Sequence, residues 1–367
     1  MLHKKMHSKT ISLKCMKKIC VLLTWVLFFS QPSQATIRTL CNMPYTPGQF
    51  TTFAAALLAA IPNDTIYVHG SSVNYGAITI NKTGIVIIGA GHNPNKQAPL
   101  PSSFTTVTVN PGINNCQLIG LTMQFLTINA STGTTVKRCK FIEYSALFGT
   151  VGISCIGTTN LTVEACVFLQ PVSGSPANIN FNNSLTNNTF IRNNVFSTQL
   201  ISNSPGTTPL TFFIENNIFL GLMPASFANI NQAIINNNIF YRSSPQGATG
   251  GAPNNVMNNN ISFSCANNTF SAPGVNNLVN VNPLFVSFPL AGATFDYAHD
   301  YRLAAGSPGL LNGTDGTDRG VFGGFGGRFN MTGEPAMAEI FSFQITSSIV
   351  IAPGGTLDIS VTSKRVR

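Results

Sequence analysis

The chain has 367 residues, of which 44% are hydrophobic and only 8% are charged. Because ordinary soluble domains carry about 25% charged residues, this sequence cannot lay charged faces along many exposed helices, which excludes helical bundles, coiled coils and acidic disordered tails. The formal net charge of +9 does not indicate a nucleic-acid partner, since six of the 20 Lys and Arg residues lie in the first 35 positions and no basic stripe remains without them.

The first 35 residues are predicted to be a secretory signal peptide. A basic Met-Lys-Lys start at Met16, an apolar core over residues 19–29 and a small-x-small cleavage motif ending at Ala35 form the usual parts of such a signal. Residues 1–15 lie upstream of this ordinary start. The apolar run is too short to span a membrane. We therefore expect cleavage after Ala35 and a protein that is secreted or associated with the cell envelope, without a transmembrane segment.

Residues 36–327 are predicted to form one domain that begins with a short helix. Residues 50–60 (FTTFAAALLAA) are rich in Ala and apolar side chains, and a helix there can cover the open edge of a first coil. Strand-like runs follow at 65–70, 76–80 and 84–91, separated by Gly and Asn turns.

A repeat of 21 to 28 residues determines the expected fold. Six segments align without gaps, and their last residues lie 27, 28, 23, 21 and 22 positions apart, a period typical of solenoids. The first position of each segment is apolar and the last is Phe in five of six, which predicts a stacked apolar core. The segments are VKRCKF (136–141), VEACVF (163–168), IRNNVF (191–196), IENNIF (214–219), INNNIF (235–240) and MNNNIS (257–262).

The fourth position of the repeat predicts a structural ladder at a tight turn. Asn tolerates left-handed backbone conformations, and when equivalent turns stack about 4.8 Å apart its amide can hydrogen-bond to the Asn above and below. The expected ladder residues are Cys139, Cys166, Asn194, Asn217, Asn238 and Asn260. The six cysteines that follow the signal lie at wide spacings without a CxxC pair, so neither a zinc site nor a dense disulfide framework is indicated. Whether Cys139 and Cys166 are bonded stays open.

The second position of the repeat alternates in charge over four coils. Lys137, Glu164, Arg192 and Glu215 each stand one strand from an opposite charge if the coils stack. A catalytic acid and base are one interpretation of this column. An exposed cross-strand ladder of modest stabilising effect is the favoured one.

One neutral run precedes each of four Asn turns, and we expect these runs to form one strand per coil. None of them contains Asp, Glu, Lys, Arg or His. The runs are GISCIG (152–157), ANINFNN (177–183), LISNS (200–204) and SFANI (226–230).

The C-terminal part departs from the repeat. Residues 300–324 are predicted to be the closing coil, with Asp315 and Asp318 in turns rather than in a calcium site, because the segment lacks the ligand density of an EF-hand loop. Residues 328–367 are predicted to form a separate β-hairpin around a Pro-Gly-Gly turn. Its strands are expected at 339–352 and 356–361.

Three parts of the chain together resemble a known family. They are the opening F-x-x-x-x-A-A-L-x-A-A-I-P-N-D-T-I-Y-V, the NN-I-F repeats and the closing D-Y-R-L-x-x-G-S-P with D-R-G-x-F-G-G. They resemble secreted bacterial right-handed parallel β-helix proteins of the pectin-lyase-like superfamily, over roughly residues 50–327. The resemblance implies an all-β, single-stranded solenoid of ten to twelve coils, with an N-terminal helical cap and a C-terminal hairpin. It does not define the function, since this class includes lyases, hydrolases and adhesins.

The resemblance also implies where chemistry would be found. Lyases of this class hold Ca²⁺ with clustered Asp and Glu while Arg or Lys removes a proton, and the hydrolases use paired or tripled Asp residues. The neutral runs lack the charged groups that either mechanism needs to stabilise developing charge. The remaining catalytic candidates are Lys137, Arg138, Lys140 and Glu143, in a charged cluster whose structural interpretation is a solvated face.

The favoured function is therefore a non-catalytic, adhesin-like solenoid that binds a polysaccharide or cell-surface glycan. It would use the flat Asn/Ser/Thr face and exposed rings such as Tyr144 and Tyr241. The alternative is an extracellular polysaccharide lyase or glycoside hydrolase of the same class. No metal or cofactor is expected, except Ca²⁺ under the lyase alternative, and no nucleic acid is expected as a partner. The ligand and the oligomeric state do not follow from the sequence.

Overall fold

The computed structural model describes most of the chain after the predicted signal peptide. The described residues are 35–44, 48–96, 98–142, 152–169, 178–182, 188–197, 201–203, 211–221, 224–247, 255–289, 294–324, 329–335, 338–345 and 359–365. The predicted signal peptide lies outside them, apart from its last residue.

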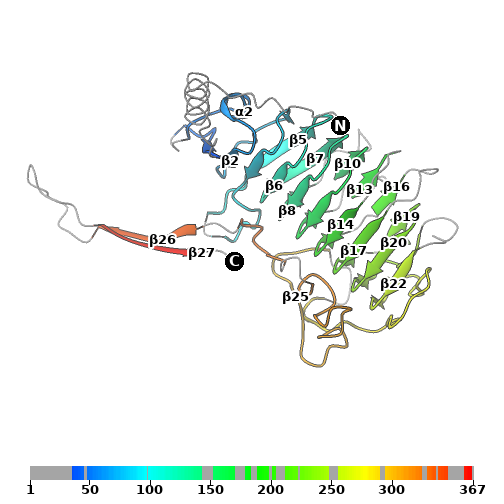
Figure 1. Cartoon of the computed structure of the whole chain (residues 1–367). Helices are drawn as coiled ribbons and strands as arrows, with labels where there is room; N and C mark the ends of the chain where they lie inside the picture. The colour runs from blue at the N-terminus through cyan, green and yellow to red at the C-terminus, as the bar shows by residue number, and fades with distance from the viewer. Residues whose placement is uncertain are drawn as a thin grey trace, which may run out of the picture. The chain divides into compact units, whose positions relative to one another are not determined.

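The first face of the molecule is a sheet of ten parallel strands from successive turns of the chain. Figure 1 shows the strands from β6 to β22 side by side in this order. Side chains alternate along each strand, so the apolar first position of the repeat points inward and the charged second position points outward. The strands are β1 (Ile37–Leu40), β2 (Thr65–Val68), β4 (Val86–Ile88), β6 (Gln117–Ile119), β8 (Thr135–Lys137), β11 (Thr162–Glu164), β14 (Thr189–Arg192), β17 (Phe212–Glu215), β20 (Ala233–Asn236) and β22 (Val256–Asn258).

A second sheet supplies two further faces, which join at the long strand β7 (Thr122–Asn129). The second face comprises β9 (Lys140–Phe141), β12 (Val167–Phe168), β15 (Val195–Phe196), β18 (Ile218–Leu220), β21 (Ile239–Tyr241) and β23 (Ile261–Phe263). The third face comprises β3 (Ile78–Ile80), β5 (Ser103–Val109), β7, β10 (Ile153–Ile156), β13 (Ile179–Phe181), β16 (Ile201–Asn203) and β19 (Phe227–Ala228).

One turn of the chain adds one strand to each face. For example, β8 on the first face leads to β9 on the second face and β10 on the third, and β11 then pairs with β8. All strand pairs within these two sheets are parallel. The chain is therefore a parallel β-helix, as the repeat and the family resemblance predict, and its ten strands on the first face lie within the expected number of coils.

The first and last positions of the repeat form the interior together with inward side chains of the third face. Because equivalent residues sit one above the other, identical side chains stack through the core. Neighbouring phenyl rings along the last position have centroids 4.7 to 4.9 Å apart, close to the strand spacing. These rings belong to Phe141, Phe168, Phe196, Phe219 and Phe240, all 2% exposed or less.

At the tight corner between the first and second faces, two positions of the repeat have different roles. The third position takes the left-handed backbone, with φ between 53° and 59°. Its residues are Arg138, Ala165, Asn193, Asn216, Asn237 and Asn259. The left-handed residue was expected one position later, at the fourth position. The side chain of the fourth position instead points inward, and the side chain of the third position faces outward.

The second face is apolar on its outer side as well. Val195, Ile218 and Ile239 have no exposed surface although they point away from the solenoid interior. A C-terminal segment, residues 294–324 and 329–335, covers them, and we call it the C-terminal strap. Its Phe295 and Val321 join these side chains in a second hydrophobic cluster. Both sides of this sheet are thus buried, which explains the continuous apolar sequence of its strands.

The strap runs back along the corner instead of adding a closing coil at the end of the stack. Outward amides of the third repeat position hydrogen-bond to it in reverse chain order. The pairs are Asn259 with Asn312, Asn237 with Thr314, Asn216 with Asp318 and Gly320, and Asn193 with Val321 and Gly323. The expectation of a closing coil at 300–324 is therefore wrong. The apolar outer side of the second face needs a cover, and the strap supplies it.

Helix α2 (Phe53–Ala59) packs against the first strands of both sheets, β1 and β3. Thr52 caps its start by accepting a hydrogen bond from the Ala55 amide at 3.3 Å. The helix thus agrees with the predicted N-terminal cap.

Two short antiparallel sheets complete the described chain. Strands β24 (Phe285–Ser287) and β25 (Asp300–Leu303) pair before the strap passes along the corner. Strands β26 (Ala338–Ile345) and β27 (Ile359–Arg365) form the expected two-stranded C-terminal sheet. The second of these strands ends later than the sequence pattern predicts, and the Pro-Gly-Gly turn lies outside the described residues.

Candidate functional site

The neutral runs of the sequence lie next to one another on the third face. Strands β10, β13, β16 and β19 are adjacent in the sheet, one from each coil, as expected. Their outward side chains continue a column that begins near the N-terminus, and none of the third-face strands contains a charged residue or His. The column consists of Thr79, Thr108, Thr127, Ser154, Asn180 and Ser202.

Polar side chains on this neutral face bond largely to each other. Asn180 donates to Asn182 at 2.9 Å, and Asn182 donates to the Ser154 hydroxyl at 3.0 Å. The Ser202 hydroxyl donates to Asn180 at 3.0 Å. This network ties neighbouring coils together and provides no acid or base.

The charged column on the first face is partly buried, not exposed as its sequence pattern suggests. Glu164 is only 3% exposed and lies between two cations. Lys137 contacts one carboxylate oxygen at 2.5 Å, and Arg192 contacts the other through Nη2 at 2.9 Å and Nε at 3.0 Å. A buried carboxylate needs such partners, so Glu164 has a structural role.

The three described residues of the predicted catalytic cluster point to different sides of one coil. Lys137 faces outward on the first face, and Arg138 lies at the corner, where its Nη1 donates to the Glu334 carbonyl at 2.6 Å. Lys140 lies on the second face with its Nζ 5.0 Å from the Tyr297 ring centroid. Burial lowers the pKa of both Arg138 and Lys140. The structure therefore does not bring these cations into one cleft, and Glu143 lies outside the described residues.

The predicted binding rings do not form a described surface. Tyr241 is 2% exposed and packs between Phe285 and Phe288 of the second hydrophobic cluster. Its assignment as an exposed ring is wrong, because the polypeptide between the last coil and the strap covers the second face where Tyr241 projects. Tyr144 lies outside the described residues.

A different aromatic surface is present on the first face. Phe190 and Phe213 occupy neighbouring strands and point outward, with ring centroids 4.8 Å apart and planes inclined by only 9°. Ile234 and Val256 continue the same column, 36% and 41% exposed. This apolar column lies on the solvent side of the sheet, two residues along each strand from the charged column.

Polar groups border the aromatic pair. The Arg192 guanidinium carbon lies 5.8 Å from the Phe190 ring centroid. Glu215 follows on the next strand, and burial raises its pKa, an effect that Arg192 and a hydrogen bond with Asn236 partly offset. Asn258 donates to the Asn236 side-chain oxygen at 3.2 Å. Donors and acceptors thus line the edge of the apolar column.

A pocket of about 260 Å³ opens where this polar column meets the strap. One wall comes from the strands and corner of the solenoid, and the other from the strap turn at Asp315. Asp315 also raises the pKa of Glu215, which indicates that the two carboxyl groups repel each other. The lining residues are Arg192, Asn193, Glu215, Asn216, Asn237, Thr314, Asp315 and Gly324.

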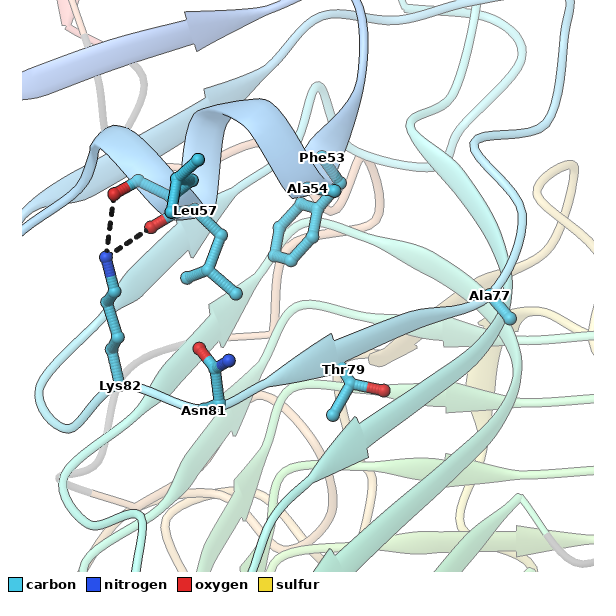
Figure 2. Close-up of a pocket in the computed structure, with 8 residues that line it drawn as sticks. Phe53, Ala54, Leu57, Ala77, Thr79, Asn81 and Lys82 are labelled. Atoms are coloured by element: carbon cyan, nitrogen blue, oxygen red, sulfur yellow. Dashed lines mark hydrogen bonds between the residues drawn. The ribbon is translucent and has the colours of Figure 1, made fainter.

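A second pocket, of about 310 Å³, lies under helix α2. Figure 2 shows Phe53 and Leu57 facing Thr79 across it. Lys82 closes one end, where its Nζ donates to the Leu57 carbonyl at 2.6 Å and to the Leu58 carbonyl at 3.0 Å, the two bonds drawn in Figure 2. It also donates to the Ala60 carbonyl at 2.6 Å. These bonds satisfy carbonyls at the end of the helix, so Lys82 acts as a helix cap.

The described residues contain no cluster of three or more His, Cys, Asp or Glu side chains arranged to hold a metal ion. Asp318 accepts from the Leu311 amide, and Asp315 accepts from Thr317, as expected for turn residues. Among the described helices, none has the length and apolar character to cross a bilayer.

Comparisons with known proteins give similarity in fold only. No family model and no curated protein matches the chain. Among solved structures, a rhamnogalacturonan lyase is 11% identical with a TM-score of 0.46, over 74% of this chain and 97% of that one. A pectate lyase is 15% identical with a TM-score of 0.43, over 79% of this chain and 96% of that one. The assignment of a parallel β-helix rests on the strand order described above.

Sequence reasoning missed the aromatic pair, although a signal for it exists. Phe190 and Phe213 each precede the charged column by two residues, so strand alternation places them on the same outward side. No such signal predicts that Asp315 lines the pocket beside Glu215, because Asp315 belongs to the strap and not to the repeat.

Proposed function

We propose that this protein is an exported, non-catalytic solenoid that binds polysaccharide on the outer side of its first face. The observation that carries this proposal is the stacked, half-buried pair Phe190 and Phe213 beside a column of polar side chains. A pyranose ring has an apolar C–H face and a rim of hydroxyl groups. It therefore suits a flat apolar surface with hydrogen-bonding groups at its edge.

The polar column supplies both kinds of hydrogen-bonding partner. Arg192 carries donors, Glu215 carries acceptors, and the amides of Asn236 and Asn258 carry both. The column repeats at the strand spacing, so an extended polysaccharide can contact successive coils, as is usual for solenoids. The pocket near Asp315 is large enough for one sugar ring or substituent and smaller than typical sites for drug-sized ligands.

The placement of charged residues supports binding without turnover. The third-face strands contain no charged residue. Lys137, Arg138 and Lys140 each have a structural partner and face different directions. Lyase and hydrolase mechanisms need preorganised groups around one reacting bond to stabilise charge there.

The test is a glycan array followed by titration calorimetry with the best ligand, using the purified protein and the double variant Phe190→Ala, Phe213→Ala. We expect the double variant to bind at least about tenfold more weakly, since it removes the apolar contact of two rings with the sugar. The matched control is Leu58→Ala, which truncates an apolar side chain that is 82% exposed on helix α2. Equal affinity of the double variant and wild type would contradict the assigned surface.

Turnover is tested in parallel on pectin, polygalacturonate, alginate and glycosaminoglycans, with and without Ca²⁺. We expect no unsaturated products and no release of reducing ends. Release of either would overturn the non-catalytic proposal and establish the lyase or hydrolase alternative.

A further inference from the structure

We infer that the pocket beside Glu215 and Asp315 recognises a protonated amino group, so that the bound polysaccharide is built from amino sugars and not from uronic acids. This inference rests on the proposed function and specifies the ligand class of the same surface. It follows from the charges around the pocket and the position of the aromatic pair.

The one cation in the described pocket lining is already paired. Arg192 directs Nε and Nη2 to Glu164, at 3.0 and 2.9 Å, on the side away from Glu215. Glu164 also pairs with Lys137, so these three groups carry one net positive charge, which Glu215 on the next strand balances. Asp315 adds one further negative charge at the pocket, so the charged column and the pocket together disfavour an anionic sugar.

Two carboxyl groups remain at the pocket. Among the described residues, Glu215 has a hydrogen-bond partner in Asn236 and no salt bridge within 4.0 Å. Asp315 uses one oxygen, Oδ1, to accept from the Thr317 amide at 3.0 Å and from the Thr317 hydroxyl at 2.7 Å. This leaves acceptor capacity on both carboxylates, which line the pocket.

The energetic preference follows from this arrangement. Burial of Glu215 raises its pKa, and the negative charge of Asp315 raises it further. A cation between two such groups relieves the repulsion and forms charge-assisted hydrogen bonds, whereas a uronate carboxylate would add a third negative charge. The pocket thus favours an ammonium group and disfavours a carboxylate.

The aromatic pair places a sugar ring at the right distance. Phe213 and Glu215 are two residues apart on the same side of β17, which separates them by about 7 Å along the strand. A ring stacked on Phe213 therefore carries its substituents toward Glu215 and the pocket. A positively charged substituent also gains from lying close to the phenyl rings.

The experiment is titration calorimetry at neutral pH with three hexasaccharides: glucosamine, N-acetylglucosamine and galacturonic acid. The protein is used as wild type and as Glu215→Gln and Asp315→Asn, which keep side-chain size while removing a charge. The control is Asp300→Asn, which removes one negative charge from an exposed pair with Arg302 away from the pocket lining. Circular dichroism melting curves confirm that each variant is folded.

We expect the glucosamine oligomer to bind at least about tenfold more tightly than the galacturonic acid oligomer, and each pocket variant to weaken glucosamine binding about tenfold while the control does not. Equal or tighter binding of the galacturonic acid oligomer overturns this inference and leaves the proposed function standing. Glucosamine binding that is unaffected by both pocket variants also overturns it. Failure of every oligosaccharide, together with an empty glycan array, overturns the proposed function itself.

Discussion

At the scale of single residues, the amide side chains of the fourth repeat position account for the regularity of the corner. The Asn217 carboxamide oxygen accepts from both the backbone and the side-chain nitrogen of Asn194, each at 3.0 Å. Its nitrogen donates to the Ile191 carbonyl at 2.8 Å and to the Asn238 oxygen at 3.0 Å. Asn260 continues the same pattern onto Asn277, a rung that lies outside the sequence repeat. Each buried amide thus has hydrogen-bond partners in its neighbours, so burying these polar groups at the corner costs little free energy.

Removal of one rung is expected to be costly. Asn217→Ala removes the acceptor of the buried Asn194 backbone amide and one hydrogen bond from each of the Asn194 and Asn238 side chains. It also removes the side-chain donor to the Ile191 carbonyl, so the free energy of unfolding should fall by at least about 2 kcal/mol. Chemical denaturation measures this change. Asn81→Ala, at an exposed position, is the matched control and should differ little from wild type. An unchanged Asn217→Ala midpoint would remove the energetic argument for the ladder.

At the scale of elements, the strap is fastened to the early coils by a buried histidine. His92 is 4% exposed, its Nδ1 lies 2.7 Å from the Tyr297 hydroxyl, and its backbone amide donates to the Thr332 carbonyl at 2.9 Å. Burial, together with the positive charges of Lys140 and Lys96, lowers the pKa of His92 to about 3. The imidazole is therefore neutral in the folded protein over most of the pH range.

This shift predicts a specific acid sensitivity. The unfolded histidine binds a proton near pH 6.5 and the folded one only near pH 3, so the unfolded state binds more protons between these values. The free energy of unfolding should therefore fall as the pH drops through this window, by up to about 1.4 kcal/mol per pH unit. Denaturation of wild type and His92→Gln at several pH values measures the difference. Since other groups titrate in both proteins, identical slopes would refute the assignment to His92.

At the scale of the whole molecule, a stack of parallel strands must protect its first edge from pairing with another chain. Helix α2 packs against β1 and β3, and Lys82 holds its end through hydrogen bonds to the Leu57, Leu58 and Ala60 carbonyls. The Leu57 side chain is buried on the inner side of helix α2, so the cap adds apolar contact as well as steric cover.

Loss of the Lys82 hydrogen bonds to helix α2 should promote self-association of the protein. Lys82→Met keeps the aliphatic stem but removes the ammonium group, leaving the helix carbonyls without that donor. We expect a lower melting temperature and larger species in light scattering, because the first strands become available for edge pairing. Arg302→Met serves as a comparison, because it removes a cation that is 67% exposed and lies away from this end. A melting temperature and particle size equal to those of wild type would contradict the role given to Lys82.

The sequence by itself determined the features that depend on neighbours at a fixed spacing. Repeated apolar and Phe positions established the stacked core, and the aligned Asn positions placed the amides that hydrogen-bond at the corner. The uncharged runs established the neutral third face. These features can be predicted because equivalent residues of successive coils contact one another in the same register. The spacing of the repeat in the sequence therefore specifies which residues are in contact.

The tertiary structure alone decided what the strap does. Asn193 meets Val321 across 128 positions of sequence, and Glu215 shares a pocket with Asp315. No sequence periodicity links these residues. The length of a long connecting segment restricts only weakly which residues it contacts. The strap therefore determines which outward side chains of the second face are buried, including Val195, Ile218 and Ile239. It also completes the pocket that is proposed to bind a charged group of the ligand.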